Sequence, residues 1–192
     1  RNICMTVVGV DWSVSGSTKS YTIVSVLGYD YTGKAYLLYS QKLDGIDILA
    51  QVARVEQLYE QFKCSMIGSE RGVGVLQGQM VKHHLGDEKV AMVNYVSAKA
   101  ALRWDKIGLY YAADRTMNMD TVILKAKIGK TKFETPCWDL TSDFWDDALN
   151  VFEEESLAGK RLYRKDPDVT DDWLHSIVFA NIASMVVRGE FV

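Results

Sequence analysis

The chain has 192 residues, of which 48% are hydrophobic and 24% charged, and its formal net charge is −3. This composition is typical of one soluble globular domain with a sizeable core, and it excludes extended disorder and low-complexity repeats. No apolar run approaches the roughly 18 residues of a membrane span. The three cysteines (Cys4, Cys64 and Cys137) contain no CxxC pair, which disfavours a disulfide framework or a zinc site and indicates a reducing compartment.

The net charge hides an uneven distribution along the chain. Residues 82–132 contain ten Lys and Arg against five Asp and Glu, whereas residues 133–172 contain four against twelve. This split fits a basic DNA-facing surface beside an acidic metal site, and it fits ordinary surface variation equally well.

The first part of the chain predicts three antiparallel strands, a helix and a further strand. Met5–Val10 is an apolar run typical of a buried central strand, and the β-branched and aromatic runs Tyr21–Leu27 and Ala35–Ser40 flank a turn-rich link. Ile46–Phe62 carries an apolar stripe at helical spacing, and Ser65–Ser69 is typical of a second buried strand.

The second part predicts more helix than strand. We expect a helix at Val75–His84, a strand at Val90–Tyr95 and an irregular region from Ser97 to Tyr111. Asp114 is the expected cap of a helix over Met117–Ala126. The remaining expected elements are a short strand or hairpin arm at Lys130–Glu134, a helix from Thr141 or Ser142 to Glu155, and a final helix from Asp171 to about Val187. This order predicts an α/β fold with a central mixed sheet flanked by helices.

Two acidic residues end predicted central strands. Asp11 follows Val8-Gly9-Val10, and Glu70 follows Met66–Ser69. A lone acid at a strand end usually caps a turn, but a carboxylate on a central strand is unfavourable unless something pairs with it. Two such acids on two central strands therefore point to a common site.

The final predicted helix adds a third acid. At 100° per residue, Asp171 and His175 fall on the same stripe as Leu174 and Val178, so they face the sheet, and Asp172 lies at the edge of that face. Acids in a first helical turn also complement the helix dipole, which is the simpler explanation.

The resulting cluster of Asp11, Glu70 and Asp171, with Asp172 and His175 beside it, suits two-metal phosphodiester hydrolysis. Hard divalent ions take carboxylate oxygens, and two of them can stabilise both the attacking and the leaving oxygen.

Several segments together resemble the nuclease domain of tailed-phage terminase large subunits. They are Val8–Trp12 (VGVDW), Gly68–Gly72 (GSERG), Ala113–Thr116 (ADRT), Lys130–Pro136 (KTKFETP) and Asp171–Ala180 (DDWLHSIVFA), and they span essentially the whole chain. Ser13 stands where a glycine is commoner, and Glu70 stands where many relatives have Asp.

The resemblance implies a ribonuclease-H-like fold and a metal-dependent endonuclease that cuts double-stranded DNA with little sequence preference during genome packaging. It implies Asp11, Glu70 and Asp171 as metal-binding catalytic acids, Asp172 and His175 as further metal-proximal residues, and two Mg²⁺ or Mn²⁺ ions. Residues 1–192 would be a single nuclease domain excised from a larger terminase whose ATPase motor is absent. The implied partners are that motor, the portal and the small terminase subunit, with no membrane, in the host cell cytoplasm.

Phosphate contacts are expected from a set of basic residues: Lys99, Arg103, Lys106, Lys125, Lys127, Lys130 and Lys132. Three other functions remain open at the level of sequence. An actin-like or sugar-kinase-type phosphotransferase fragment would hold nucleotide phosphates at Ser13–Ser20, although no GxxxxGK[ST] motif is present. A recombination nuclease or transposase would share the core, and a degenerate interaction domain would keep the acids without cleaving DNA.

Overall fold

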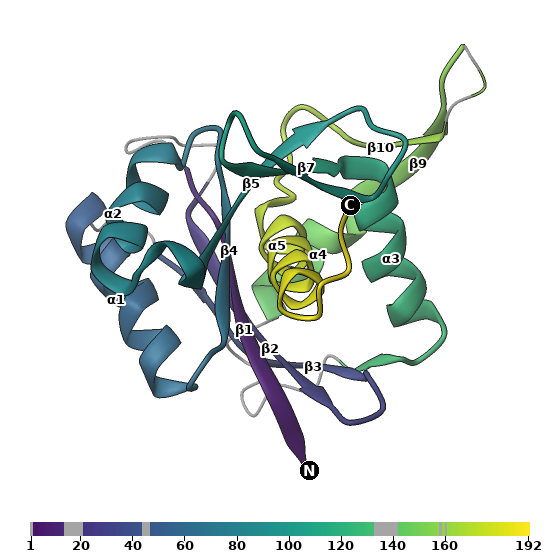
Figure 1. The fold of residues 1–192 in the computed structure, drawn as a ribbon. Coiled ribbons are helices and arrows are strands. Elements are labelled where there is room, and N and C mark those ends of the chain that lie inside the picture. Colours follow the sequence, from purple (N-terminus) through teal and green to yellow (C-terminus); the bar gives the residue numbers. More distant parts are fainter. Residues whose placement is uncertain (1, 14–20, 44–46, 133–141, 158, 160) are drawn as a thin grey trace.

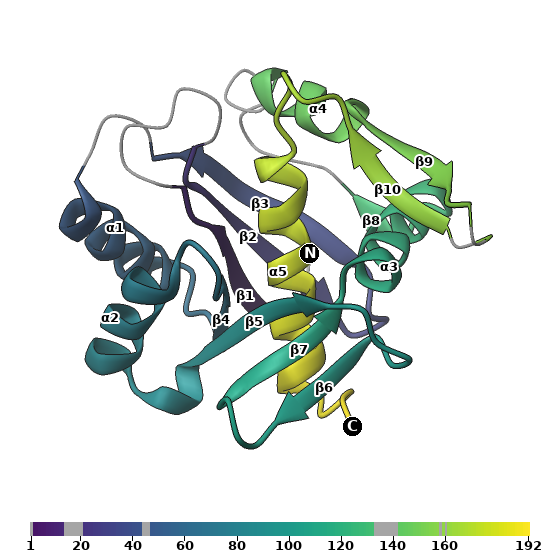
Figure 2. The same ribbon diagram turned by 90° about the horizontal axis from the view of Figure 1, so that it is seen from above.

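The computed structural model describes residues 2–13, 21–43, 47–132, 142–157, 159 and 161–192, and for 131–132 and 142–145 it describes the backbone alone. Its centre is a mixed eight-stranded sheet in the order β6-β7-β5-β4-β1-β2-β3-β8, beside which stands a separate hairpin of β9 and β10 (Figures 1 and 2). The strands are β1 (Ile3–Asp11), β2 (Ile23–Asp30), β3 (Ala35–Lys42), β4 (Met66–Glu70), β5 (Val90–Val96), β6 (Leu102–Asp105), β7 (Tyr110–Asp114), β8 (Thr131–Lys132), β9 (Val151–Glu155) and β10 (Arg161–Lys165).

The strand directions confirm the expected mixed sheet. β1, β2 and β3 pair antiparallel, as their sequence pattern predicts. β4 pairs parallel to β1, β5 parallel to β4, and β7 parallel to β5. The carboxyl ends of β1 and β4 therefore lie at the same edge of the sheet.

Helices cover both faces of the sheet (Figure 1). The helices are α1 (Ile48–Gln61), α2 (Val75–Leu85), α3 (Arg115–Lys127), α4 (Ser142–Leu149), α5 (Asp172–Val187) and the short 3₁₀ helix η1 (Asp87–Lys89). α1 and α2 lie against one face, and α3, α4 and α5 lie on the other. Because alternate residues of β1 point to opposite faces, Val7 packs with α5 while Val8 packs with α1, which explains the unbroken apolar run of that strand. Among the described helices, none is long and apolar enough to cross a bilayer.

The α5 backbone packs directly against β1 and β4 because a glycine of each strand faces the helix. A Cβ atom at Gly9 would lie 1.9 Å from the Ser176 carbonyl oxygen, and one at Gly68 would lie 2.0 Å from the Phe179 carbonyl oxygen. Any side chain at either position would push the helix away. Because α3 and α4 cover its other sides, residues 172–184 of α5 are buried all round rather than along one stripe (Figure 1).

Two predictions of secondary structure are wrong. The region from Ser97 to Tyr111 is not irregular throughout, because it contains β6 and begins β7; the Asp105 carboxylate accepts the Ile107 and Gly108 amides and stabilises the turn between these strands. The helix expected to reach Glu155 ends at Leu149, since Val151–Glu155 forms β9 and pairs with β10. Ion pairs between the charged side chains of those two strands favour the hairpin.

Candidate active site

The two strand-end acids point to the face that α5 covers. Asp11 follows Gly9 by two residues and Glu70 follows Gly68 by two, and side chains two apart on a strand share a face. Since both glycines contact α5, both acids project toward the region where α5 begins. The structure therefore brings Asp11 and Glu70 together, as their positions in the sequence predict.

The first turn of α5 adds Asp171 and Asp172 to this region. Both are buried, with 5% and 8% of their surfaces exposed. The Tyr21 backbone amide, just before β2, donates a hydrogen bond to Asp172 Oδ2 at 2.8 Å. Because Asp11 pairs with Ile23 across the β1–β2 ladder, this bond ties the start of α5 to the strand pair that carries Asp11.

Electrostatics show how closely the four acids interact. Desolvation raises the pKa of Asp11 well above its usual value, and the negative charges of Asp172, Glu70 and Asp171 raise it further, in that order of strength. The positive charge of Arg115 acts against this repulsion. Asp172 is therefore the acid most strongly coupled to Asp11, and a cation placed among these groups would relieve the repulsion.

Asp171 lies in a different environment from Asp172. Its Oδ2 accepts a hydrogen bond from the Arg115 guanidinium at 2.9 Å and lies 3.1 Å from His175 Nε2, and its Oδ1 lies 3.5 Å from the Lys165 ammonium. Although burial alone would raise the pKa of Asp171, the hydrogen bond from His175 and the charges of His175, Lys165 and Arg115 hold it at about 2. Asp171 is thus an ionised carboxylate already surrounded by cationic partners.

His175 and Tyr95 continue this network into the core. The Tyr95 hydroxyl lies 2.9 Å from His175 Nδ1, and the Tyr95 ring stacks on Phe179 one turn further along α5. Burial and the charge of Asp11 raise the pKa of Tyr95 well above its usual value, so its hydroxyl keeps its proton. The histidine expected near the metal is therefore fixed on both ring nitrogens by protein groups.

The donor set fits a hard divalent cation, although the side chains are not gathered around an ion position. Both Glu70 oxygens accept loop amides, from Val73 at 3.3 Å and from Gly74 at 3.1 Å. Within the part of the chain that the structure describes, no three His, Cys, Asp or Glu side chains form a ready metal cage. Each Glu70 oxygen retains a second lone pair for a metal ion. Mg²⁺ and Mn²⁺ prefer such carboxylate oxygens, and either ion would relieve the repulsion between Asp11 and the neighbouring acids.

Sequence reasoning missed three residues of this site: Arg115, Tyr95 and Lys165. Arg115 carried a usable signal, because it is the first residue of α3 and a cation at a helix N-terminus opposes the helix dipole. Its Nη1 also donates to the Tyr163 carbonyl of β10 at 2.8 Å, so it links the β9–β10 hairpin to α5. No sequence pattern marks Tyr95 or Lys165.

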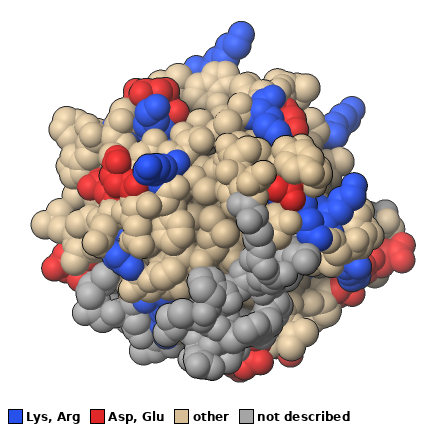
Figure 3. All heavy atoms as spheres, turned by 90° about the horizontal axis from the view of Figure 1, so that it is seen from below, with Lys and Arg blue, Asp and Glu red and all other residues tan. Residues whose placement is uncertain are grey.

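The basic residues expected to contact DNA are spread over different surfaces. Lys99 is exposed beyond the carboxyl end of β5, on the side of the carboxylates, and Arg103 forms an ion pair with Asp105 at 3.8 Å. Lys125 is half-buried and donates to Asn181 Oδ1 at 2.9 Å, far along α5 from Asp171. The others are Lys106, Lys127 and Lys130, which are exposed, and Lys132, whose side chain lies outside the described residues. On the face in Figure 3, the coloured Lys and Arg are interspersed with Asp and Glu and form no continuous stripe.

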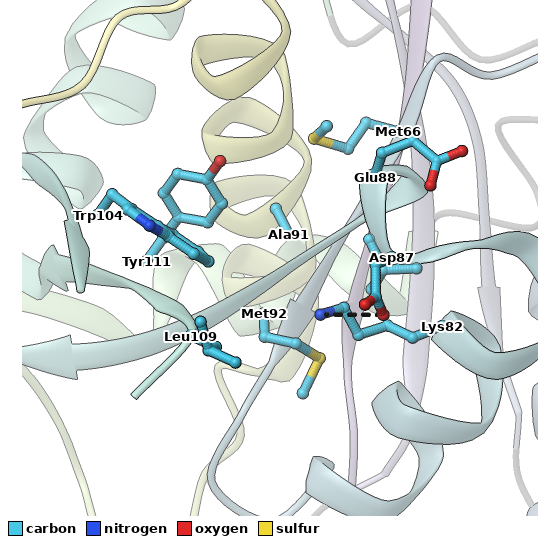
Figure 4. Close-up of a pocket in the computed structure, with 10 residues that line it drawn as sticks. Met66, Lys82, Asp87, Glu88, Ala91, Met92, Trp104, Leu109 and Tyr111 are labelled. Atoms are coloured by element: carbon cyan, nitrogen blue, oxygen red, sulfur yellow. Dashed lines mark ion pairs between the residues drawn. The ribbon is translucent and has the colours of Figure 1, made fainter. Parts of the chain in front are cut away.

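Two cavities lie beside the sheet. One, of about 270 Å³, is lined by Tyr95, Arg115 and Tyr163 among others and adjoins the network around His175. The other, of about 360 Å³, lies at the opposite end of β4 from Glu70, between Trp104 and Tyr111 on one side and the Lys82–Asp87 ion pair on the other (Figure 4). The nucleotide loop of the phosphotransferase hypothesis, at Ser13–Ser20, falls almost entirely outside the described residues.

Comparison with known proteins gives a consistent result at the level of structure. No protein-family model and no curated protein sequence matches the chain. Among solved structures, the large terminase nuclease of the thermophilic phage G20c superposes with a TM-score of 0.65 and 16% identity over 93% of this chain and 81% of that one. Other structures of that nuclease contain magnesium or cobalt.

Two further phages supply similar structures. The large terminase nuclease domain of bacteriophage SPP1, with bound Mn, has a TM-score of 0.57 and 10% identity over 93% of this chain and 86% of that one. The large terminase of bacteriophage HK97 has a TM-score of 0.60 and 10% identity over 92% of this chain but only 38% of its own. At these identities the likeness concerns architecture: the chain has the ribonuclease-H-like fold of the nuclease domains of phage large terminases.

Proposed function

We propose that this chain is the nuclease domain of a phage large terminase and that it cuts double-stranded DNA with little sequence preference during genome packaging. The observation that carries the proposal is the meeting of carboxylates from β1, β4 and α5 at one edge of the sheet, where burial and then the repulsion between these carboxylates raise the pKa of Asp11. Similar folds that contain magnesium, cobalt or manganese support a divalent metal as the cation.

Within this site we assign Asp11, Glu70 and Asp172 as the residues that hold divalent ions. The two-metal chemistry expected from the sequence implies two such ions. The assignment of Asp172 rests on its negative charge, which raises the pKa of Asp11 more than the charges of Glu70 and Asp171 do. Asp172 also has partners of its own, among them the Tyr21 amide. Bound Mg²⁺ or Mn²⁺ would supply positive charge against the charge that develops on a phosphodiester during hydrolysis. For Asp171, which the sequence resemblance implies as a metal-binding acid, we propose a different role: it fixes Arg115 and His175, which its carboxylate contacts.

Among the described residues, Arg115 is the cation best placed to contact a substrate phosphate. Its side chain is 36% exposed, while its partner Asp171 is 7% exposed, so the guanidinium spans from the interior to the surface. Arginine presents several donors in a fixed plane, so it can keep Asp171 and still donate outward. Lys99 and the other exposed basic residues would add sequence-independent phosphate contacts.

The proposal includes the larger machine. The chain covers 38% of the HK97 large terminase, which fits a nuclease domain that works with an ATPase domain, a portal and a small terminase subunit in the host cell cytoplasm. The formal net charge of −3 favours weak DNA binding by this domain alone, because most non-specific affinity for DNA comes from excess positive charge. The rest of the machine would then supply the high local concentration of DNA.

The test is cleavage of supercoiled plasmid in Mn²⁺, Mg²⁺ or EDTA. We expect nicked and linear products with either metal and none with EDTA, and a loss of at least about 100-fold in rate in Asp11→Asn and Glu70→Gln. Asp87→Asn is the matched control, since Asp87 is an exposed acid at the far end of the sheet. An intact plasmid after incubation with folded wild-type protein in Mn²⁺ would refute the proposal, and nucleotide binding would then favour the phosphotransferase alternative.

A further inference from the structure

The turn that presents Asp171 and Asp172 lacks a cap of its own. A helix leaves its first amides without intrahelical acceptors, and the residue before the helix normally caps one of them with its side chain. Asp171 occupies that position in α5 but makes no capping hydrogen bond. Its carboxylate is instead directed to Arg115 and Lys165.

A buried acid from another helix fills this gap. Asp147, in the last turn of α4, is 5% exposed, and its Oδ2 accepts the Trp173 amide at 3.0 Å. Its Oδ1 accepts the Thr170 hydroxyl. One carboxylate therefore binds the residues on both sides of the Asp171–Asp172 pair.

Further contacts hold the same turn. The Asn150 side-chain amide donates to the Thr170 carbonyl at 3.3 Å, and the Lys165 ammonium donates to the Val169 carbonyl at 2.6 Å. A buried carboxylate is unfavourable unless hydrogen bonds compensate for its desolvation, so the position of Asp147 depends on the groups it binds. The preceding residue, Asp146, is exposed and offers a comparison within the same helix turn.

We propose that Asp147 is a positioning residue: it caps α5 in place of Asp171 and thereby fixes the direction in which Asp172 faces Asp11. The inference rests on the proposed function for its catalytic consequence. Because a second helix supplies the cap, the Asp171 carboxylate can bind Arg115 instead of the first amides of α5. Groups that orient metal ligands without touching the metal typically change affinity or activity 10- to 100-fold when removed.

The test compares Asp147→Ala, Asp147→Asn and Asp146→Asn with the wild type by three measurements. Hydrogen exchange measures the protection of the Trp173 amide, electron paramagnetic resonance measures Mn²⁺ affinity, and plasmid cleavage measures nuclease activity. In Asp147→Ala we expect the Trp173 amide to exchange at least about 10-fold faster and Mn²⁺ to bind about 10-fold more weakly. Asp147→Asn, which keeps an acceptor oxygen, should recover part of both losses, and Asp146→Asn should match the wild type.

A purely structural role predicts a different result. If Asp147→Ala lowers the melting temperature but binds Mn²⁺ as tightly as the wild type, or if Asp146→Asn shows the same losses, the positioning role is refuted. If Asp147→Ala does not fold, the melting temperature and Mn²⁺ affinity of Asp147→Asn are compared with those of the wild type in the same way. If the wild type neither binds Mn²⁺ nor cleaves DNA, the proposed function fails. An unchanged exchange rate of the Trp173 amide in Asp147→Ala would separately refute the capping role of Asp147.

Discussion

The close packing of α5 on the sheet makes Gly9→Ala a sharp test of the fold around the site. The added Cβ would lie 1.9 Å from the Ser176 carbonyl oxygen and 2.2 Å from the Ala180 amide nitrogen. Ordinary contact needs about 3.4 Å, so the helix must shift by about 1.5 Å or the strand must distort. Both clashing atoms belong to the backbone and cannot rotate away, unlike the end of a flexible side chain.

Overpacking in a core typically costs about 1–3 kcal/mol, and a backbone clash belongs at the upper end of that range. We therefore expect Gly9→Ala to lower the free energy of unfolding by about 3 kcal/mol. For a domain of this size that corresponds to a fall of about 6–12 °C in the melting temperature. Because Ser176 lies one turn beyond Asp172, the same shift should also weaken Mn²⁺ binding.

Urea denaturation followed by circular dichroism measures the loss of stability, with Gly33→Ala as the control. Gly33 has a φ of 79° and nothing within 4 Å of its Cβ position, so the substitution adds backbone strain without a clash. Such strain costs about 1 kcal/mol. If Gly9→Ala is no more destabilising than Gly33→Ala, then α5 does not depend on the glycine for its close approach and the packing argument is wrong.

Three further predictions concern the charged residues of the site. The pKa of Asp11 is higher in the folded than in the unfolded protein, so ionisation of Asp11 destabilises the fold as pH rises. In EDTA, Asp11→Asn should therefore be more stable than the wild type at neutral pH. Urea titrations should show this difference in stability vanishing by about pH 4. Asp171 behaves oppositely: its pKa of about 2 lies below the unfolded value, so it contributes stability above pH 4 that is lost toward pH 2. The deficit of Asp171→Asn relative to the wild type should accordingly shrink by about 2 kcal/mol between pH 6 and pH 2, and a constant deficit would contradict the ion-pair assignment. Arg115→Ala should destabilise the fold by about 2 kcal/mol, because it takes one of three partners from the buried Asp171 and the side-chain donor from the Tyr163 carbonyl. Arg115→Lys should not restore stability, since one ammonium cannot bond both Asp171 and the Tyr163 carbonyl. Full recovery by lysine in thermal melts would show that charge alone matters.

Local sequence patterns were sufficient for the elements with strong periodicity. The apolar run of β1, the helical stripe of α1 and the Asp114 cap of α3, which accepts the Met117 amide at 3.0 Å, are all confirmed. β6 was missed because it has four residues and is held by its neighbour rather than by its own pattern. β9 resembled a continuation of α4 because glutamates favour helix, and only pairing with β10 makes it a strand.

The division of roles between Asp171 and Asp172 could not be predicted from the sequence. Both precede or begin the same helix, and only the positions of Arg115 on α3 and Lys165 on β10 distinguish them. Arg115 and Asp171 are 56 residues apart in the chain, so neither periodicity nor spacing predicts their contact. The capping of α5 by Asp147 depends in the same way on how α4 packs against α5.

The most direct test of the proposed metal site is a titration of the purified domain with Mn²⁺, with free Mn²⁺ measured by electron paramagnetic resonance. We predict saturable binding by the wild type, at least about 10-fold weaker binding by Asp172→Asn, and a smaller loss in Asp171→Asn. Absence of saturable binding by the wild type would contradict the metal site itself. Loss of binding in Asp171→Asn with unchanged binding in Asp172→Asn would contradict the assignment of Asp172 as the residue that holds the ion.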